Sequence, residues 1–314
     1  MSVHVIFGAG SAGRATMQAL QLQGCRVKMI SRSIKPGLPS SVDQVAGDAT
    51  DVEFVKSVTQ DAAVVYQTLG APYHRWKEEL FPMQKSLVEG IRGRNIPLVA
   101  LENLYLYGDT LGKPMTEFST LQAQTRKGKV RLAMAQQLQT AHAKGDIQVA
   151  QVRAADFIGP GVTQSVIGEN FFQSLTKGRT TWVLGEPDQL HTFSYIPDLG
   201  KTMVRVGQKE EFFGHTWHVP SPAPKSVGEL VHRFAEELGE QPKLAATPAW
   251  LLKIMGIFQP ELGELPEMLY QWKQPFIMEH SHSSENLGIT PTPWQEIISE
   301  MLASWRQKML TIKS

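Results

Sequence analysis

Three glycines near the start of the chain have the spacing of a phosphate-binding turn. The apolar segment His4–Phe7 runs directly into the sequence GAGSAG, and an alanine- and leucine-rich helical pattern follows. In such a turn the first glycine permits the bend, the second lets a diphosphate approach the backbone, and the third lets the helix pack against the strand. Free N–H groups and the helix dipole then favour an anion. The sequence therefore predicts a dinucleotide site at Gly8, Gly10, Ser11, Ala12 and Gly13.

The end of the second apolar segment discriminates between the two nicotinamide dinucleotides. NAD sites commonly place an Asp or Glu there, about 20 residues past the glycines, to hold the ribose 2′-hydroxyl. This segment instead ends in Ser31, Arg32 and Ser33. The serines can donate hydrogen bonds, and the Arg32 guanidinium can pair with a 2′-phosphate or stack on adenine. A solvated loop arginine is the alternative, but the missing acid and the present cation both favour NADP(H) over NAD(H).

Short apolar segments alternate with amphipathic ones through the first half of the chain. The apolar segments are rich in β-branched residues and cover His4–Phe7, Val27–Ile30, Ala62–Tyr66, Pro97–Leu101 and Ile147–Val152. Helical periodicity lies between them, over Arg14–Gln23, Trp76–Arg94 and Gln124–Ala143. Wholly apolar strands separated by helices indicate a parallel sheet covered on both faces. We therefore predict an α/β fold with a Rossmann-type, doubly wound parallel sheet and right-handed crossovers.

Breaks in the second half of the chain predict a smaller, mainly helical C-terminal lobe for the substrate. Gly159–Gly161 interrupts the pattern, and Pro220–Pro224 interrupts it again. We expect residues 1–158 and 191–220 to form the nucleotide-binding domain, and 159–190 and 221–314 to form the substrate lobe. The frequent Trp and Met residues beyond Pro224 are expected to form the core of that lobe, namely Trp250, Met255, Met268, Trp272, Met278, Trp294 and Trp305.

Several motifs together resemble the extended short-chain dehydrogenase/reductase family. Besides the glycine turn they are Gly47–Asp51 after the third strand, Leu69–Ala71 after the fourth, Leu104–Gly108 after the fifth, and His191–Asp198 further on. The resemblance covers nearly the whole chain and extends to sequences labelled NAD-dependent epimerase/dehydratase. It implies a nicotinamide dinucleotide cofactor and a substrate cleft at the carboxyl ends of the strands.

The resemblance also implies further contacts with the cofactor. In the family, the aspartate that matches Asp48 holds the adenine amino group, although Gly-Asp is also ordinary turn chemistry. The segment that matches Leu69–Ala71 passes beside the nicotinamide-side ribose, and the one that contains Asp156 passes the nicotinamide amide. Asp156 is either a buried acid near the cleft or a turn residue. Beyond the glycine turn, the expected cofactor residues are Ser31, Arg32, Asp48, Ala49, Leu69, Gly70, Ala71 and Asp156.

Different residues occupy the catalytic positions of that family. Its members use a Ser or Thr after the fifth strand and a Tyr-x-x-x-Lys on the next long helix, where the lysine lowers the pKa of the phenol that exchanges a proton with the substrate. By register, the serine position falls on Asn103, the tyrosine on Lys127 and the lysine on Arg131. No tyrosine lies between Tyr107 and Tyr195, so a shifted alignment does not restore the motif.

The roles of these substituted residues stay open at the level of sequence. Arg131 can hold ribose hydroxyls, and its charge is expected to lower the pKa of Lys127, which could then act as a general acid. Asn103 can donate a hydrogen bond to a substrate oxygen. Tyr105 either supplies a phenol to the cleft or packs under the loop. In the alternative, Lys127 and Arg131 belong to a solvated basic helix face, and the protein has no proton relay.

Two further groups of residues carry weaker signals. His191 and Tyr195 lie where the chain returns to the first lobe, and the family sometimes places substrate contacts there. The segment Glu279–His282 contains two alternating histidines, which would point to opposite faces of a strand. We therefore expect a surface segment there and no metal site.

The composition is that of an ordinary globular protein and disfavours several kinds of partner. The 314 residues include 31 Lys and Arg against 30 Asp and Glu, and this balance does not favour nucleic acid or a membrane. The single cysteine, Cys25, cannot form an intramolecular disulfide and fits a reducing compartment. No apolar run reaches the ~18 residues of a membrane span. We expect a cytoplasmic protein, and the resemblance implies a homodimer formed through Trp76–Arg94 and Gln124–Ala143.

Three functional hypotheses follow from the sequence. The first is an NADP(H)-dependent oxidoreductase with an atypical catalytic site, acting on a carbonyl or alcohol of a small substrate. The second is an NAD-dependent nucleotide-sugar epimerase or dehydratase, which requires tightly held NAD and a working base. The third is a binding protein that senses NADP without catalysis. No motif of the second lobe identifies the substrate.

Overall fold

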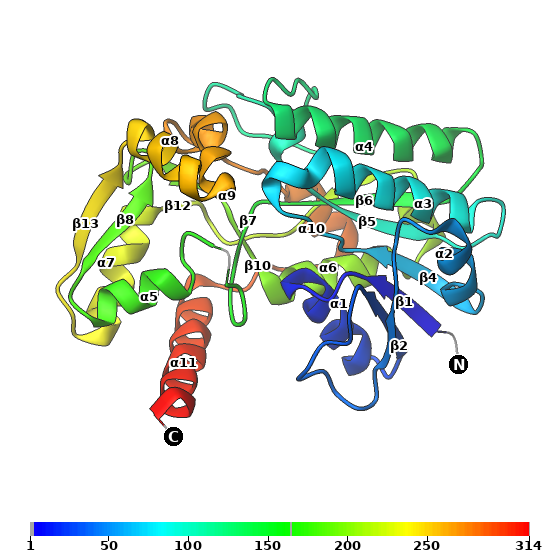
Figure 1. Cartoon of the computed structure of the whole chain (residues 1–314), viewed down its shortest axis with the longest axis horizontal. Coiled ribbons are helices and arrows are strands. Elements are labelled where there is room, and N and C mark those ends of the chain that lie inside the picture. The colour runs from blue at the N-terminus through cyan, green and yellow to red at the C-terminus, as the bar shows by residue number, and fades with distance from the viewer. Residues whose placement is uncertain (1–2, 164, 314) are drawn as a thin grey trace.

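Seven parallel strands form one sheet at the centre of the larger lobe (Figure 1). The computed structural model describes residues 3–163 and 165–313, and its sheet has the strand order β11-β6-β5-β4-β1-β2-β3. These strands are β1 (Val3–Phe7), β2 (Arg26–Ser31), β3 (Asp43–Ala46), β4 (Ala62–Gln67), β5 (Leu98–Asn103), β6 (Val149–Ala154) and β11 (Thr216–His218). The order reverses between β1 and β4, and open α/β sheets bind ligands at such a switch point. The predicted doubly wound fold is confirmed.

Helices cover both faces of this sheet. α1 (Ser11–Leu22) and α6 (Ile196–Val206) lie together on one face (Figure 1). The other face carries α2 (Val52–Val58), α3 (Phe81–Ile91) and α4 (Arg126–Ala143). Side chains alternate along a strand, so β1 sends Ile6 into one core and Val5 and Phe7 into the other. Both faces of the strands are therefore apolar, as the continuous apolar segments predict.

The helix after β4 begins with a widened turn. The sequence predicts one helix over Trp76–Arg94, whereas the structure has a 3₁₀ turn, η1 (Tyr73–Arg75), a π-helical turn, η2 (Trp76–Leu80), and then α3. Pro82 in the first turn of α3 has no N–H to donate to the preceding turn, and the wider turn accommodates the missing bond. The result is that Trp76 stacks on Tyr105, just after β5.

The smaller lobe is mainly helical and also contains short strand pairs. Its helical elements are α5 (Glu169–Thr176), α7 (Val227–Leu238), α8 (Ala249–Phe258), α9 (Pro260–Gly263), η5 (Pro266–Trp272) and α11 (Trp294–Lys313). The sequence predicts mostly helix beyond Pro224, but β13 (Lys243–Thr247) pairs in parallel with β8 (Thr180–Leu184). The partner strand lies about 60 residues earlier, and such tertiary pairing decides the conformation of a short segment.

Two connections carry the chain between the lobes. β7 (Asp156–Ile158) follows β6 and pairs in parallel with β10 (Phe193–Tyr195), while β9 (Leu190–His191) pairs with β12 (Lys225–Ser226). The remaining short elements are η3 (Tyr105–Tyr107), η4 (Glu210–Phe212) and α10 (Ser281–Leu287). α6 and β11 both fall within residues 191–220. The domain bounds at residues 158 and 220 stay a prediction.

The sequence predicts that the Trp and Met residues beyond Pro224 form the core of the smaller lobe. In the structure they do not form one core. Trp272 and Trp305 are buried in the smaller lobe, but Met268 and Met278 join the cores on the two faces of the central sheet. The chain after α9 thus returns across the larger lobe. Trp250 is 63% exposed on α8, and the side chain of Met255 lies outside the described part of the structure.

Candidate active site

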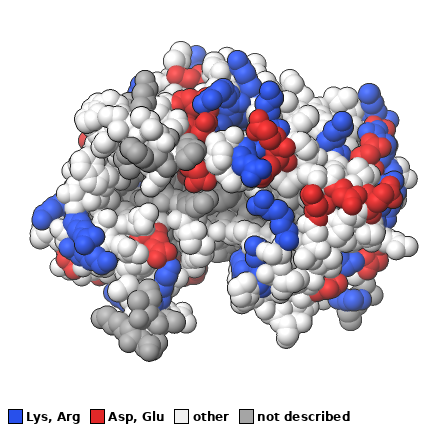
Figure 2. All heavy atoms as spheres, viewed as in Figure 1, with Lys and Arg blue, Asp and Glu red and all other residues white. Residues whose placement is uncertain are grey.

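A cavity of about 640 Å³ follows the carboxyl ends of the central strands. It runs from Ser31 at the end of β2, past the glycine turn after β1 and Thr68 after β4, to Asn103 at the end of β5 and Asp156 after β6. Figure 2 shows the hollow between the two lobes, with charged side chains gathered along its upper rim. The cavity therefore lies across the switch point of the sheet, and its size suits a dinucleotide with a small second ligand.

The glycine turn leaves an open cradle at the start of α1. Gly8 has a φ of +114°, which favours glycine, and a Cβ on Gly13 would lie 1.9 Å from the Gly8 carbonyl oxygen. A Cβ on Gly10 would meet nothing within 4 Å, and Gly10 caps α1 without a side-chain hydrogen bond. Gly8, Gly10, Ser11 and Ala12 line the cavity, whereas Gly13 packs the helix against the turn. Free N–H groups facing an open cradle fit the diphosphate of a dinucleotide.

The end of the cavity beside β2 is basic. Ser31, Arg32 and Lys35 line it, and no carboxylate from the described residues lines it there. The Arg32 side chain is 72% exposed, and its guanidinium lies 3.8 Å from the Glu79 carboxylate. Lys35 Nζ donates a hydrogen bond to the Ser33 hydroxyl at 3.0 Å. The Arg32 side chain stays exposed beside Glu79, and the partner of Lys35 is a neutral hydroxyl, so both cations can turn toward a ribose phosphate.

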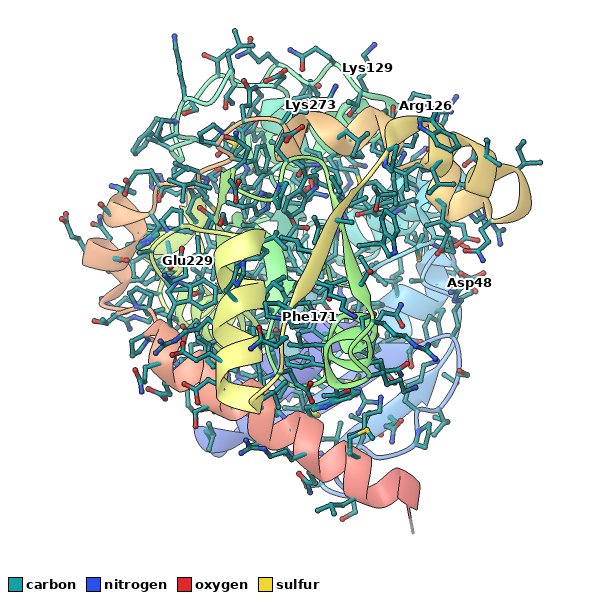
Figure 3. The ribbon with its side chains drawn as sticks, turned by 90° about the vertical axis from the view of Figure 1, so that its left-hand side faces the viewer. Asp48, Arg126, Lys129, Phe171, Glu229 and Lys273 are labelled. Carbon is teal, nitrogen blue, oxygen red and sulfur yellow. The ribbon has the colours of Figure 1, made fainter. Side chains whose placement is uncertain are left out.

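Asp48 lies at the rim of this end and not among the residues that line the cavity. It is exposed on the loop after β3, at the edge of the molecule in Figure 3, while the neighbouring Ala49 lines the cavity. The Thr50 N–H donates to the Asp48 carboxylate at 2.9 Å and holds the pKa of that carboxyl below its usual value. This hydrogen bond is the turn chemistry that the sequence left as the alternative. Contact with adenine stays a prediction.

Two tyrosines and one asparagine meet at the other end of the cavity. Asn103 Oδ1 accepts a hydrogen bond from the Tyr105 N–H at 3.1 Å, and the hydroxyls of Tyr105 and Tyr73 lie 2.7 Å apart. Leu69, Gly70 and Ala71 line the same region. Burial raises the pKa of the Tyr105 and Tyr73 phenols. Both phenols therefore stay protonated and can donate hydrogen bonds, but neither resembles an activated phenolate.

Arg131 faces the cavity beside a buried carboxyl group. Its guanidinium lies 4.5 Å from the centre of the Trp76 ring and 3.5 Å from Glu102. Neither carboxyl oxygen of Glu102 has a hydrogen-bond partner in the described structure. Burial raises the pKa of Glu102, although Arg131 and Arg153 oppose the shift. Arg131 is thus positioned by an aromatic ring and an acid, and the solvated alternative is wrong for it.

Lys127 is buried outside the cavity. Its side chain is 2% exposed, and its ammonium group donates to the Glu264 carboxylate and, at 2.5 Å, to the Glu267 carboxylate. It also lies 5.5 Å from the centre of the Tyr73 ring. The solvated alternative is wrong for Lys127 too, whereas Arg126 and Lys129 point outward at the top of the molecule (Figure 3). Lys127 joins α4 to the segment around η5 and does not line the cavity.

The buried position of Glu102 predicts a characteristic pH dependence of stability. An acid whose pKa is raised by folding loses its stabilising contribution as the pH rises from the ordinary value of 4.5 through the folded-state value. We expect Glu102→Gln, which keeps the neutral shape, to gain stability relative to the natural protein between pH 5 and pH 8. Urea unfolding at both pH values measures this difference. A stability difference between the two proteins that does not change with pH would contradict a raised pKa for Glu102.

A sequence-family model described as "NAD dependent epimerase/dehydratase family" matches residues 4–219. The chain belongs to this family. The matched residues include the glycine turn, Asn103, Lys127 and Arg131, whereas the partners of Lys127, Glu264 and Glu267, lie beyond the match. No curated protein matches the sequence.

Solved structures with the same fold include several members that act on nucleotide sugars. MoeE5 in complex with UDP-glucose and NAD has a TM-score of 0.79 at 19% identity, over 98% of this chain and 100% of that chain. An epimerase from Methanothermobacter thermautotrophicus has a TM-score of 0.83 at 15% identity, over 99% and 94%. The dTDP-glucose 4,6-dehydratase of Bacillus anthracis, solved with NAD, has a TM-score of 0.81 at 12% identity, over 98% and 97%. At these identities the likeness concerns the fold.

In this epimerase/dehydratase family member, Asp156 lies in the cavity and His191 lies behind it. The Asp156 carboxylate is 2.7 Å from His191 Nε2, and the His191 ring is buried against Trp272 at a centroid distance of 3.9 Å. Tyr195, the other residue of the returning segment, donates its hydroxyl to Glu300 and does not line the cavity. Of the two substrate contacts that the sequence suggested, His191 alone therefore reaches the site, through Asp156.

The segment Glu279–His282 is the start of a helix and not a strand. α10 begins at Ser281, and the left-handed Gly288 ends it. The His282 ring stacks on Trp217 at a centroid distance of 5.6 Å. Within residues 3–163 and 165–313, no cluster of His, Cys, Asp and Glu could hold a metal ion, and no helix is long and apolar enough to span a bilayer.

Sequence reasoning missed several residues of the cavity. Tyr73 and Trp76 line it from η1 and η2, and Gln271 and Phe276 line it from the far part of the chain. No local signal marks the last two, because they reach the site by long-range packing. Glu102 did carry a signal, since a single acid in the otherwise apolar strand Leu98–Asn103 is costly to bury without a purpose.

Proposed function

We propose that this protein binds a nicotinamide dinucleotide along the cavity and moves a hydride between it and a carbonyl or alcohol carbon of a small substrate. The observation that best supports this proposal is one continuous cavity. It extends from the basic end at Ser31, across the open cradle at Gly10, to the polar groups at Asn103 and Asp156. Structural neighbours solved with NAD support this proposal. When bound, the nicotinamide ring supplies the hydride chemistry.

The residues of the chain would divide the work along the cavity. The N–H groups at Gly10, Ser11 and Ala12 would hold the diphosphate at the positive end of α1. Leu69–Ala71 would border the nicotinamide-side ribose. Arg131, fixed by Trp76 and Glu102, would bind ribose hydroxyls with a permanent positive charge.

We further propose a preference for NADP(H), because the residues that line the cavity beside β2 include Arg32 and Lys35 and no acid. Replacing Arg32 with alanine is expected to weaken NADPH binding about tenfold, the scale of one charge-assisted hydrogen bond on an exposed side chain, and to leave NADH binding unchanged. Tryptophan fluorescence reports binding directly, since Trp76 lines the cavity.

Arg26→Ala is the matched control for this experiment. Arg26 is an exposed arginine at the opposite end of the same strand, about 20 Å from Arg32 at 3.3 Å per residue. The Arg26→Ala variant should bind both dinucleotides as the natural protein does. Tighter binding of NADH than of NADPH by the natural protein would remove the NADP assignment. Failure to bind either dinucleotide would overturn the proposed function itself.

A second candidate function is nucleotide-sugar epimerisation or dehydration, which the family and its solved members favour. It requires NAD that stays bound while the substrate is oxidised and reduced again. Freshly purified protein would then release NAD on denaturation, which mass spectrometry detects. The natural protein would also convert UDP-glucose or dTDP-glucose without added cofactor. Purified protein without NAD and without such conversion would reject this candidate.

A further inference from the structure

We propose that the substrate end of the cavity accepts a hydroxylated compound without phosphate groups, and that Asp156, positioned by His191, takes the proton from its hydroxyl. This inference rests on the proposed function, because the oxidised dinucleotide must accept the hydride. It assigns a proton acceptor to a site that lacks the tyrosine and lysine of its family.

Other groups near the substrate end are poorly suited to accept a proton. The Tyr105 and Tyr73 phenols are buried and hydrogen-bonded to each other, and burial raises their pKa. Arg131 does not lose its proton in proteins. Lys127 is held by two carboxylates outside the cavity, and Glu102 is fully buried beneath Arg131.

Asp156 differs from these groups in its exposure and in its free oxygen atom. Its side chain is 33% exposed and lines the cavity, and only one of its carboxylate oxygens, Oδ2, is paired with His191. No described residue donates a hydrogen bond to Oδ1. A carboxyl group with one anchored and one open oxygen can accept a proton from a bound hydroxyl through the open oxygen.

His191 holds that carboxylate in one orientation. β7 and β10 pair Asp156 with Phe193, and His191 lies two residues earlier, so its side chain lies on the same side as that of Phe193. The imidazole ring is parallel to Trp272 within 5°, and Nδ1 is buried without a hydrogen-bond partner. A proton on Nδ1 would have no acceptor there, whereas Nε2 faces the Asp156 carboxylate at 2.7 Å. The tautomer with its proton on Nε2, donated to Asp156, therefore fits this environment.

The charges along the cavity separate a basic cofactor end from an acidic substrate end. The charged residues that line it are Arg32, Lys35, Glu102, Arg131 and Asp156. Arg32 and Lys35 follow β2, which lies four strand positions from β6, or about 19 Å at the usual spacing of strands. The Arg131 guanidinium is held against the Trp76 ring and lies 3.5 Å from Glu102. Asp156 is the partly exposed acid at this end of the cavity, and its carboxylate would repel a phosphate placed beside it.

An adjoining hollow of about 130 Å³ does not reverse this charge balance. It shares Val162 and Thr163 with the main cavity and is lined by Lys308 and Glu169, which pair at 2.6 Å. Glu169 also lies in the first turn of α5, where its carboxylate already complements the positive end of the helix. A nucleotide diphosphate that extended into this hollow would therefore find Lys308 already paired with Glu169. It would also find the positive end of α5 already complemented by the Glu169 carboxylate.

The proposed step balances in atoms and charge. The substrate O–H bond breaks and its proton passes to Asp156 Oδ1. The electron pair of the neighbouring C–H bond leaves as hydride to the oxidised dinucleotide, and a C=O bond forms. Asp156 then releases the proton to solvent, to which it is exposed. In the reverse direction the protonated Asp156 donates to the carbonyl oxygen.

The charge of the substrate end is tested by titrating UDP-glucose into the NADP⁺-saturated full chain by calorimetry. We expect no binding by the natural protein up to about 1 mM, and at least about tenfold tighter binding by Asp156→Asn. Asp188→Asn, which removes an exposed acid of the smaller lobe, is the control and should behave as the natural protein does. Micromolar binding of UDP-glucose by the natural protein, with no gain in the Asp156 variant, would overturn the substrate class.

The proton acceptor is tested by presenting glycerol, myo-inositol, glucose and glucosamine to the same complex and following NADPH at 340 nm. At least one of these uncharged or cationic compounds should be oxidised. Asp156→Asn should lower that rate at least about 100-fold, far more than any change in its NADP⁺ affinity, which fluorescence measures separately. Oxidation of none of them by the natural protein, or an undiminished rate in the variant, would overturn the proposal. If the natural protein did not bind NADP⁺ at all, the proposed function itself would be wrong.

The positioning role of His191 has its own readout. Nitrogen-15 NMR of the histidine rings should show the His191 proton on Nε2 in the natural protein, and a mixture of tautomers in Asp156→Asn. His191→Gln, which keeps a donor to Asp156, should retain more of the oxidation rate than His191→Ala, with equal NADP⁺ affinity. A proton on Nδ1 in the natural protein would contradict the arrangement.

Discussion

Gly10→Asp is expected to weaken dinucleotide binding strongly without weakening the fold. A side chain at this position enters open space at the N-terminus of α1, since a Cβ there would meet no atom within 4 Å. Aspartate is a good N-cap residue and its charge complements the helix dipole, so the melting temperature should stay the same or rise slightly. The same carboxylate would occupy the cradle and repel a diphosphate. We expect the dissociation constant for NADPH to rise at least about 100-fold, as measured by tryptophan fluorescence.

Two further substitutions separate the loss of the cradle from damage to the fold. Gly10→Ser caps the helix without adding charge and should weaken binding only about tenfold. Gly13→Ala places a Cβ 1.9 Å from the Gly8 carbonyl oxygen, so the backbone must shift and the melting temperature should fall. If Gly10→Asp bound NADPH within about threefold of the natural protein, the diphosphate would lie elsewhere.

The parts of the fold that the sequence predicted correctly depend on local patterns. β1, β4 and β5 are buried on both faces, so each appears in the sequence as a continuous apolar run. The glycine turn was predictable because its geometry is set within six consecutive residues. The switch point then follows from the topology of a doubly wound sheet, and with it the position of the cavity.

The parts of the site that the sequence could not predict depend on contacts between distant segments. The basic stretch around Lys127 has the local pattern of a solvated helix face. Lys127 is nevertheless buried, and its carboxylate partners, Glu264 and Glu267, lie beyond the matched family residues. The sequence identified Asp156 and His191 separately, but it could not reveal that the pairing of β7 with β10 brings them within hydrogen-bond distance.

These findings change the chemical interpretation of the substituted catalytic helix. Arg131 keeps a position at the cavity, whereas Lys127 has become part of the contact between α4 and the segment around η5. In our proposal, proton transfer is assigned to Asp156 on the strand after β6 and not to the helix after β5. We therefore expect cofactor binding and proton transfer to be separable, because Asp156 lies on β7, whereas Arg131 lies on α4 and the glycine cradle lies at the start of α1.

The Lys127→Met variant is expected to lose stability. The Glu264 and Glu267 side chains are 17% and 19% exposed. Removing the ammonium group would leave these two neighbouring carboxylates with the exposed Arg126, which pairs with both, as a weaker counter-charge. We expect a loss of about 3 kcal/mol in the free energy of unfolding, the scale of a broken buried ion pair. At about 2 °C per kcal/mol for a chain of this size, the melting temperature should fall by about 6 °C. Calorimetry and urea unfolding measure both quantities.

The pH dependence of this loss has a defined sign. Burial alone would raise the pKa of Glu267, but its bonds with Lys127 and Arg126 hold that pKa below the ordinary value of 4.5. An acid with a depressed folded-state pKa stabilises the protein above its unfolded pKa and loses this effect as the pH falls through the folded value. The stability difference between the natural protein and Lys127→Met should therefore be full at pH 7 and shrink below pH 4.5.

A rescue variant distinguishes this structural role from general-acid catalysis. Neutralising both acids in Lys127→Met/Glu264→Gln/Glu267→Gln should restore most of the lost stability, because the repulsion between the two neighbouring carboxylates is gone. If Lys127 were the general acid, Lys127→Met would keep its melting temperature and lose turnover, and the triple variant would not recover it. Because the ammonium group is enclosed by two carboxylates and lies outside the cavity, we expect the stability effect and its rescue.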